Sequence, residues 1–175
     1  AGEQIDPELV WGSDLQVIRQ VMIQTEIFEI DAIGVTSFGE SVIFVDQEGN
    51  SLADSIYYYD TRGEEQAEWM YQNLDIEEFY HTTGVSPNST YSLAKIMWVR
   101  SNQPEIYEKT WKILLFADFI LFRLGAMVHC SPSLAARTMA FDVFNKTWAE
   151  DILQKCEIDK DLFADVLPSG SIAGE

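Results

Sequence analysis

The sequence predicts an α/β fold, a mixed sheet with helices, on three observations. An apolar helical face opens the chain, short runs of β-branched residues follow it, and helical spacing dominates after residue 60. The chain has 175 residues, 47% of them hydrophobic and 13% aromatic, which is enough to build the core of one domain or most of one. We therefore expect a small sheet covered by helices.

The first helix is expected to begin at residue 7. Asp6 has the side chain of an N-cap, and Pro7 suits the first helical position because its fixed φ is already helical. Apolar residues then recur at helical spacing and form one face: Val10, Trp11, Leu15, Ile18, Val21 and Met22.

Three strands are expected next, at residues 30–36, 42–46 and 55–59. Residues 47–50 supply a short turn, so the strands on either side of it should pair antiparallel. Strand alternation would set Tyr58 on the face opposite its two tyrosine neighbours. The first strand would keep an unpaired edge unless further sequence covers it, which suggests that sequence precedes residue 1.

The second half of the chain is expected to be largely helical. Helices are predicted over residues 64–74, around residues 93–100 and over residues 148–156, with a short buried strand at 112–116. Asp118 stands alone in an apolar run, and we interpret it as the N-cap of a helix over residues 119–124 rather than as a catalytic group. The methionines and tryptophans at helical spacing are expected in the core.

Charge and composition exclude several classes of function. A net charge of −18 repels phosphate backbones and anionic lipid, so no nucleic-acid or membrane partner is expected. Cys130 and Cys156 show no CxxC spacing and predict reduced thiols in a cytoplasmic protein. His81 and His129 lie far apart in the sequence, so no histidine metal site is expected. No signal peptide is visible, and the apolar run at residues 113–124 is too short and too charged to span a bilayer.

A series of short blocks runs along the whole chain. It begins with residues 2–7 and Trp11, continues with residues 33–40, Val45-Asp46 and Gly49, and reaches Tyr59-Asp-Thr-Arg62. Thr83-Gly84, Lys95 with Trp98, Pro104-Glu105, residues 117–120, Leu124-Gly125, residues 135–138, Asp142 and Trp148 complete it. In order and spacing these blocks resemble the FGGY family of carbohydrate kinases, in particular its xylulokinase-like members.

The resemblance implies a partial actin/RNase H-like domain with a ribonuclease H-like motif. It also implies an ATP- and Mg²⁺-dependent kinase that transfers the γ-phosphate of ATP to a hydroxyl of a small-molecule ketose or polyol. Homodimers are common in the family. The family's D-x-G-T-[ST] phosphate loop and the general base of its G-G-x-D-[NQ] segment do not occur in this sequence. We therefore expect residues 1–175 to be an internal part of the N-terminal domain, inactive alone and without catalytic residues, metal or nucleotide of its own.

Six residues are candidates for contact with the sugar: Gly39, Glu40, Asp60, Arg62, Thr90 and Tyr91. The resemblance places Gly39-Glu40 where glycerol kinases have arginine–glutamate and xylulokinases methionine–histidine, in contact with substrate hydroxyls. Gly39 would also let backbone approach a ligand closely. Gly39-Glu40 matches neither pair fully, so the sugar stays open.

The other candidates are less specific. Asp60 and Arg62 are spaced for a local ion pair, and Thr90-Tyr91 fall where family members place a substrate-contacting aromatic residue. Each has a structural alternative: a solvated turn for Glu40, organisation of a turn for Asp60 and Arg62, and helix packing for Tyr91.

Two other functions compete with the kinase. A glycoside hydrolase could use Glu40 and Asp60, if these carboxylates face each other across a cleft. A non-catalytic sugar-binding or interaction domain could use the same scaffold. The kinase is favoured because the matching blocks extend far beyond those two carboxylates. Residues 169–174 contain two glycines but no lysine, and do not form a phosphate loop.

Overall fold

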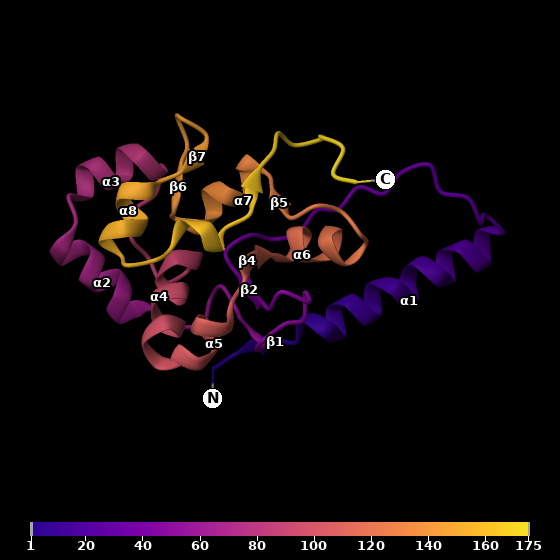
Figure 1. Ribbon diagram of the computed structural model, residues 1–175, viewed down its shortest axis with the longest axis horizontal. Coiled ribbons are helices and arrows are strands. Elements are labelled where there is room, and N and C mark those ends of the chain that lie inside the picture. Colours follow the sequence, from indigo (N-terminus) through magenta and orange to yellow (C-terminus); the bar gives the residue numbers. More distant parts are fainter. Residues whose placement is uncertain (1, 175) are drawn as a thin grey trace.

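The structure is a computed structural model that describes residues 2–174. It mixes helices and short strands, as the sequence predicts (Figure 1). The helices are α1 (Pro7–Thr25), α2 (Glu64–Asn73), α3 (Ile76–Thr83), α4 (Ser92–Asn102), α5 (Pro104–Lys109), α6 (Phe116–Arg123), α7 (Pro132–Ala135) and α8 (Glu150–Lys155), with 3₁₀ turns η1 (Ala136–Thr138) and η2 (Lys160–Leu162). The strands are β1 (Gln4–Ile5), β2 (Val42–Val45), β3 (Ser55–Ile56), β4 (Lys112–Leu115), β5 (His129–Cys130), β6 (Phe141–Asp142), β7 (Thr147–Trp148) and β8 (Asp165–Val166).

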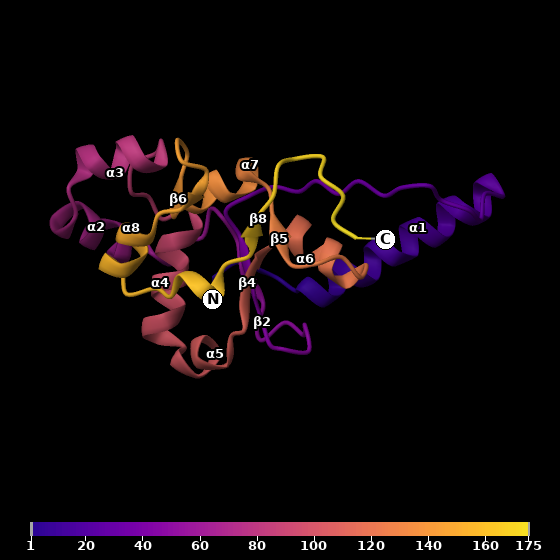
Figure 2. The same cartoon turned by 45° about the horizontal axis from the view of Figure 1, so that its top comes forward.

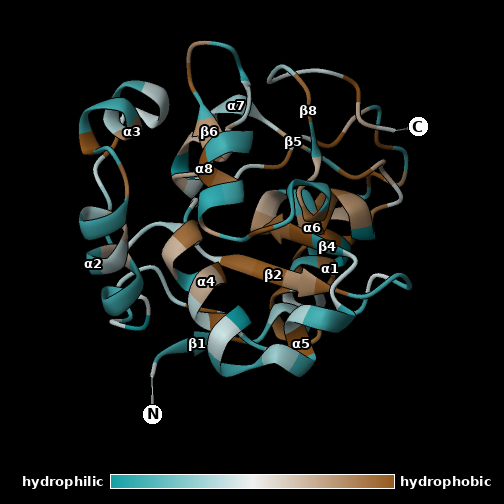
Figure 3. Cartoon of the chain, turned by 60° about the vertical axis from the view of Figure 1, so that its left-hand side comes forward, coloured by the Kyte–Doolittle hydropathy of each residue, from teal (hydrophilic) through white to brown (hydrophobic). Residues whose placement is uncertain are grey.

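The centre of the core is the antiparallel ladder of β2 and β4. Val42 lies opposite Leu115 and Val45 opposite Lys112. All four residues of β2 are buried, which explains why this strand is hydrophobic on both faces instead of alternating. Helix α6 packs against both strands, and α4 lies beside them with residues 92–97 all buried (Figure 3). Burial of these apolar side chains is the main stabilising contribution to the fold.

The strand pairing after β2 differs from the prediction. The turn at residues 46–50 is present. The N–H of Asp46 donates to the carbonyl of Asn50 at 3.1 Å, the N–H of Asn50 donates to the Asp46 carboxylate at 2.9 Å, and Gly49 adopts a φ of 82°. Beyond it only Ser51 bridges back to β2, at Val45. The ladder partner of β2 is β4, and the predicted third strand is the two-residue β3, which pairs antiparallel with β1.

The three tyrosines at residues 57–59 form a turn and not a strand, so the predicted alternation of their side chains is wrong. The N–H of Asp60 donates to the carbonyl of Tyr57 at 3.1 Å. The Asp60 carboxylate also accepts from the backbone N–H of Arg62 at 2.9 Å. These local bonds turn the chain just after β3 and compete successfully with a sheet ladder.

The strand predicted at residues 30–36 is also wrong. These residues form no strand with any part of residues 2–174, and most of them are exposed. Composition alone does not make a strand, because β-branched residues favour one only where neighbours pack against them. The segment follows α1, whose far end projects from the body of the molecule (Figures 1 and 2). Large apolar side chains are exposed along this projection: Val17, Val21, Ile23, Ile27, Phe28, Ile30 and Ile33.

The start of α1 is held as the sequence predicts. The Asp6 carboxylate accepts from the N–H of Glu8 at 2.8 Å, and Pro7 occupies the first turn. Arg123 of α6 pairs with Glu8 at 2.7 Å and lies 5.2 Å from the ring centroid of Trp11. These contacts fix the first turns of α1 to the core.

Asp118 is not the N-cap of its helix. Helix α6 begins at Phe116, two residues before Asp118, and the Asp118 carboxylate reaches back to accept from the N–H of Leu115 at 3.1 Å. The side chain therefore caps the helix from its third position, as the acidic member of a capping box does. The run from residue 113 to residue 120 is buried throughout, so the helix can begin directly from β4.

Asp118→Asn is expected to change how stability depends on pH. Burial raises the pKa of Asp118 to about 6. A carboxyl whose pKa is raised by folding stabilises the native state at low pH, and this contribution is lost as the pH rises through about 6. The free energy of unfolding of the parent should therefore fall relative to that of the variant between about pH 4 and 6. Urea denaturation of both proteins at several pH values measures this, with the exposed Asp151→Asn as control. Parallel curves for the parent and Asp118→Asn would contradict the burial argument.

The second half contains short strands that carry little sequence signal. Trp148 lies in β7, opposite Phe141 of β6, so α8 begins only at Glu150 and not at residue 148. Strands β5 and β8 pair parallel at His129 and Asp165. No helix within residues 2–174 combines the length and the apolar character needed to cross a bilayer.

Candidate functional site

Glu40 lies in an unusual backbone conformation between residue 38 and β2. Its φ is 70°, and the N–H of Ser41 donates to the carbonyl of Gly39 at 2.8 Å. A hydrogen bond from residue i+2 to residue i around a positive φ makes this a γ-turn, which is a strained conformation for a residue other than glycine. The Glu40 carbonyl accepts from the Ser92 hydroxyl at 2.7 Å, which ties the turn to the start of α4. Such strain persists where surrounding contacts hold it, and it occurs frequently in functional sites.

The Glu40 side chain is paired with an arginine that is distant in the sequence. Nε and Nη2 of Arg137 both contact Oε1 of Glu40. The Glu40 side chain is 11% exposed, whereas that of Arg137 is 45% exposed. The Arg137 guanidinium also lies 5.0 Å from the ring centroid of Tyr91. Burial lowers the pKa of Arg137, but the hydrogen bond and the charge of Glu40 outweigh it and raise that pKa above its ordinary value.

Gly39 makes room for that arginine. A Cβ on Gly39 would lie 2.6 Å from Cβ and 2.8 Å from Cγ of Arg137. The space beside the Gly39 backbone is therefore filled by the Arg137 stem. Any side chain at position 39 would displace Arg137 from its place beside Glu40.

Asp60 and Arg62 form the ion pair that their spacing permits. The carboxylate of Asp60 accepts from Nε and Nη2 of Arg62, both at 2.8 Å, and from two backbone N–H groups, those of Arg62 and Glu3. The hydrogen bonds from Arg62 hold the pKa of Asp60 at about 2. Because both carboxylate oxygens are occupied, this pair chiefly fastens the chain before β1 to the turn after β3. Arg62 also lies over the ring of Trp98 at 5.3 Å.

The buried side chain of Lys95 connects two loops of the site. It is only 1% exposed, and its ammonium donates to the carbonyls of Tyr58 at 3.1 Å, of Thr90 at 3.3 Å and of Ser89. Burial lowers the pKa of Lys95 to about 8. The tyrosine turn and the loop before α4 are therefore fixed to each other through a single buried side chain.

An exposed aromatic cluster includes Phe38, two residues before Glu40. Phe38 stacks on Tyr57 with ring centroids 6.3 Å apart and lies 6.4 Å from the ring of Tyr58, which meets Tyr59 edge to face at 5.1 Å. Phe38, Tyr58 and Tyr59 are each at least 40% exposed. Aromatic faces of this kind suit the C–H groups of a sugar or polyol, while the neighbouring Glu40 suits its hydroxyls.

The structure thus gathers the six predicted residues around α4 and the two loops that meet there. Glu40, Arg137 and Tyr91 form one contact set, and the Asp60–Arg62 pair forms a second. Thr90 contributes its carbonyl to the ammonium of Lys95. Residues 135–138 and Lys95 belong to matching blocks of the sequence, but no sequence pattern places Arg137 beside Glu40, so neither Arg137 nor Lys95 could be assigned a role from the sequence.

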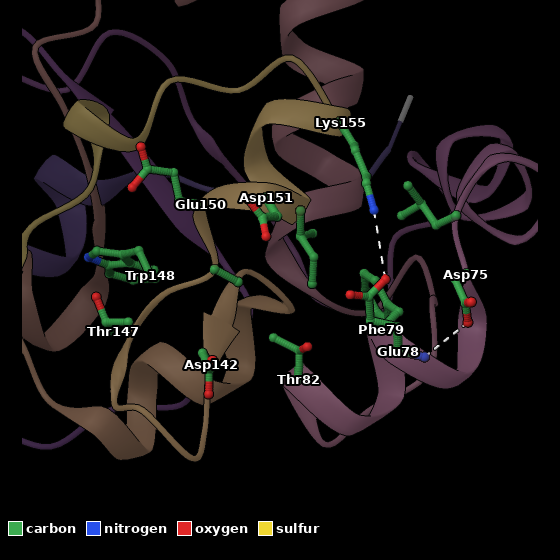
Figure 4. Close-up of a pocket in the computed structure, with 13 residues that line it drawn as sticks. Asp75, Glu78, Phe79, Thr82, Asp142, Thr147, Trp148, Glu150, Asp151 and Lys155 are labelled. Carbon is green, nitrogen blue, oxygen red and sulfur yellow. Dashed lines mark hydrogen bonds and ion pairs between the residues drawn. The ribbon is translucent and has the colours of Figure 1, made fainter.

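A cavity of about 290 Å³ lies elsewhere, between α3, the β6–β7 hairpin and α8 (Figure 4). Four of its five carboxylates have structural partners: Asp75 caps α3, Asp142 accepts from the backbone of residues 144 and 145, Glu78 lies 3.9 Å from Lys155, and Glu150 pairs with Lys160. None of the six candidate residues lines it. We do not place the site there.

Comparison with known proteins decides the family. The sequence model of the N-terminal domain of the FGGY family of carbohydrate kinases matches residues 2–175. This chain belongs to the FGGY family. The chain is 25% identical to a xylulose kinase of Staphylococcus xylosus over 98% of its own length and 36% of that protein. It is 30% identical to a glycerol kinase of Limosilactobacillus reuteri over 97% of its length and 36% of that protein. A gluconate kinase structure from Lactobacillus acidophilus superposes with a TM-score of 0.88 at 19% identity, covering 98% of this chain and 35% of that one.

These matches confirm the family and the actin/RNase H-like fold of its N-terminal domains. The chain spans about a third of the length of the relatives that it matches. The named substrates of those relatives are xylulose, glycerol and gluconate, so the family does not by itself name a sugar for this chain.

Proposed function

We propose that this FGGY domain supplies part of the sugar-binding site of an ATP-dependent kinase, and that the substrate is a ketose or polyol. The observation that carries the proposal is Glu40, which is held in a strained backbone conformation with its carboxylate on Arg137, two residues after the exposed Phe38. Two relatives of this chain are a xylulose kinase and a glycerol kinase, so a neutral polyhydroxy compound is the first substrate to test.

The residues of this chain would bind and orient the sugar. A sugar hydroxyl loses its water on binding and needs a donor and an acceptor in return. Glu40 offers acceptor oxygens, and the rings of Phe38 and Tyr58 offer an apolar face. Because Ser92 and Lys95 fix the loops that carry these groups, the site is organised before the sugar arrives. Such preorganisation places a hydroxyl for in-line attack on a phosphoryl group.

We assign no residue of this chain to the nucleotide or to Mg²⁺. Within residues 2–174 no group of three or more histidine, cysteine or acidic side chains could hold a metal ion. Magnesium and ATP would supply the phosphoryl group and neutralise its charge in the reaction, and no step at Glu40 depends on their position.

The carboxylates do not suit a glycoside hydrolase. Such an enzyme needs a protonated general acid beside a second carboxylate. Asp60 has all its oxygens occupied and a pKa of about 2, which disfavours protonation at neutral pH. The Glu40 carboxylate is occupied at Oε1 by the guanidinium of Arg137. Asp60 is therefore not suited to protonate a leaving group, and Glu40 already has a structural partner.

The test is ADP release by the full-length product of the gene, supplied with ATP, Mg²⁺ and a panel of ketoses, polyols and sugar acids. Turnover of a ketose or polyol would support the proposal and name the substrate. A folded protein that binds ATP and turns over no member of the panel would contradict it and favour a non-catalytic sugar-binding domain.

A further inference from the structure

We infer that Arg137 is a specificity-determining residue, and that the Glu40–Arg137 pair binds two neighbouring hydroxyls of an uncharged substrate. The inference rests on the proposed function and adds a residue and a ligand pattern to it. It starts from the geometry of the pair and from the space that Gly39 leaves for it.

The pair is oriented so that it can offer both a donor and an acceptor. Both contacts from Arg137 go to Oε1 of Glu40, and Oε2 has no hydrogen-bond partner among residues 2–174. Arg137 uses two of its five N–H groups on Glu40, and 45% of its side chain stays exposed. A free carboxylate oxygen and unused guanidinium donors therefore lie side by side.

A pair of vicinal hydroxyls matches that arrangement. Each hydroxyl can donate one hydrogen bond and accept others. One hydroxyl can donate to Oε2 of Glu40 while its neighbour accepts from Arg137. Both bonds involve a charged partner, which makes them about twice as strong as bonds between neutral groups.

The charge of the pair favours a neutral ligand over an acid. Glu40 and Arg137 cancel each other, so a ligand carboxylate would have to compete with Glu40 for the guanidinium and would meet its negative charge. A neutral diol meets no such repulsion. The inference therefore predicts preference for a ketose or polyol over the corresponding sugar acid.

Other contacts hold the guanidinium in position. Tyr91 lies beneath it at 5.0 Å, and the Arg137 stem fills the space where a side chain at position 39 would lie. Gly39→Ala would place a Cβ 2.6 Å from Cβ of Arg137 and displace the arginine without removing its charge. This gives a second variant that acts on the position of Arg137 alone.

The experiment combines variants with substrate analogues in the full-length protein. Affinity for the sugar is measured by calorimetry without ATP, and its Michaelis constant is measured in the ADP assay. The parent, Arg137→Met and Gly39→Ala are compared on the sugar and on two analogues that each lack one of two neighbouring hydroxyls. Arg100→Met is the matched control, because Arg100 is also a partly exposed arginine paired with a glutamate, Glu157.

We expect Arg137→Met to weaken sugar binding roughly tenfold to a hundredfold, the size of a lost charged hydrogen bond. The parent should bind one of the two deoxy analogues more weakly than the sugar, by a similar factor. Arg137→Met should bind that analogue as well as the parent does, because the loss of the hydroxyl and the loss of the arginine remove the same hydrogen bond. Gly39→Ala should show a smaller loss of the same kind, and Arg100→Met none. The Michaelis constant for ATP should be unchanged throughout.

Two results would overturn the inference. In one, Arg137→Met binds the sugar and both analogues as the parent does, which would leave the kinase intact and remove Arg137 from the site. In the other, the parent prefers a sugar acid, or binds no neutral sugar at all. If the parent binds a neutral sugar and releases no ADP, the proposed kinase fails while the calorimetric comparison still decides the role of Arg137.

Discussion

Glu40→Gln in the full-length protein is expected to raise the Michaelis constant for the sugar roughly tenfold to a hundredfold, because a charged acceptor and the anchor of Arg137 are lost together. The amide keeps the size of the side chain and can remain in the γ-turn. The Michaelis constant for ATP should not change. Initial rates over a matrix of sugar and ATP concentrations separate the two constants.

Glu157→Gln is the matched control for this substitution. Glu157 is also a non-glycine residue with a positive φ, 56°, and it also pairs with an arginine, Arg100. It lies outside the candidate site and should leave both Michaelis constants unchanged. Equal effects of the two substitutions, or no effect of Glu40→Gln on the sugar, would remove Glu40 from the binding site.

Lys95→Met is expected to be the most destabilising single change at the site, with a loss of roughly 2–4 kcal/mol in the free energy of unfolding. The ammonium of the buried Lys95 is the shared donor for the part-buried carbonyls of Tyr58, Ser89 and Thr90, and methionine offers these carbonyls no donor in its place. The exposed Lys155→Met should cost little, because Lys155 has only a long contact to Glu78. Urea denaturation of the three proteins measures the difference.

The effect of Lys95 should also depend on pH. Burial lowers the pKa of Lys95 to about 8, below its unfolded value of 10.5. Between these values the unfolded chain binds more protons at this site than the folded one, so stability from Lys95 rises with pH. The difference in unfolding free energy between the parent and Lys95→Met should therefore grow from about pH 8 to 10. If the difference in unfolding free energy stays constant over this range, the ammonium of Lys95 is not buried as the structure shows.

The parts of the fold that sequence predicts well are those where local pattern and burial agree. Strand β2 is apolar along its whole length and is buried, and helix α4 has an apolar run that is buried with it: Leu93, Ala94, Ile96, Met97 and Val99. Helix α1 carries its own cap in Asp6 and Pro7, so its start follows from two residues. In these segments the residues of the segment itself are enough to predict the helix or strand, without knowledge of distant contacts.

The failures occur where a distant partner decides the outcome. Residues 30–36 have strand composition but no partner among the described residues, and they stay irregular. The turn at the three tyrosines is set by the Asp60 carboxylate, whose effect on the backbone is invisible in a strand pattern. Strands as short as β5 and β6 contain too few residues for any periodicity.

The same distinction holds for the site. Glu40 could be chosen as a candidate because it follows a glycine before a buried strand and lies in a matching block. Its partner Arg137 lies 97 residues away in the sequence, and only the folded chain brings them together. Glycine at position 39 suggested a close approach of a ligand to the backbone, whereas the space beside Gly39 is filled by the stem of Arg137 and the positive φ is at Glu40.

A crystal structure of the full-length protein with its neutral sugar bound would show directly whether Glu40 and Arg137 hold the substrate. We expect one sugar hydroxyl within hydrogen-bond distance of Oε2 of Glu40, its neighbour within reach of Arg137, and carbon atoms of the sugar against the exposed aromatic cluster. A sugar bound in the cavity between α3 and α8, or anywhere that leaves Glu40 and Arg137 without a ligand contact, would contradict it.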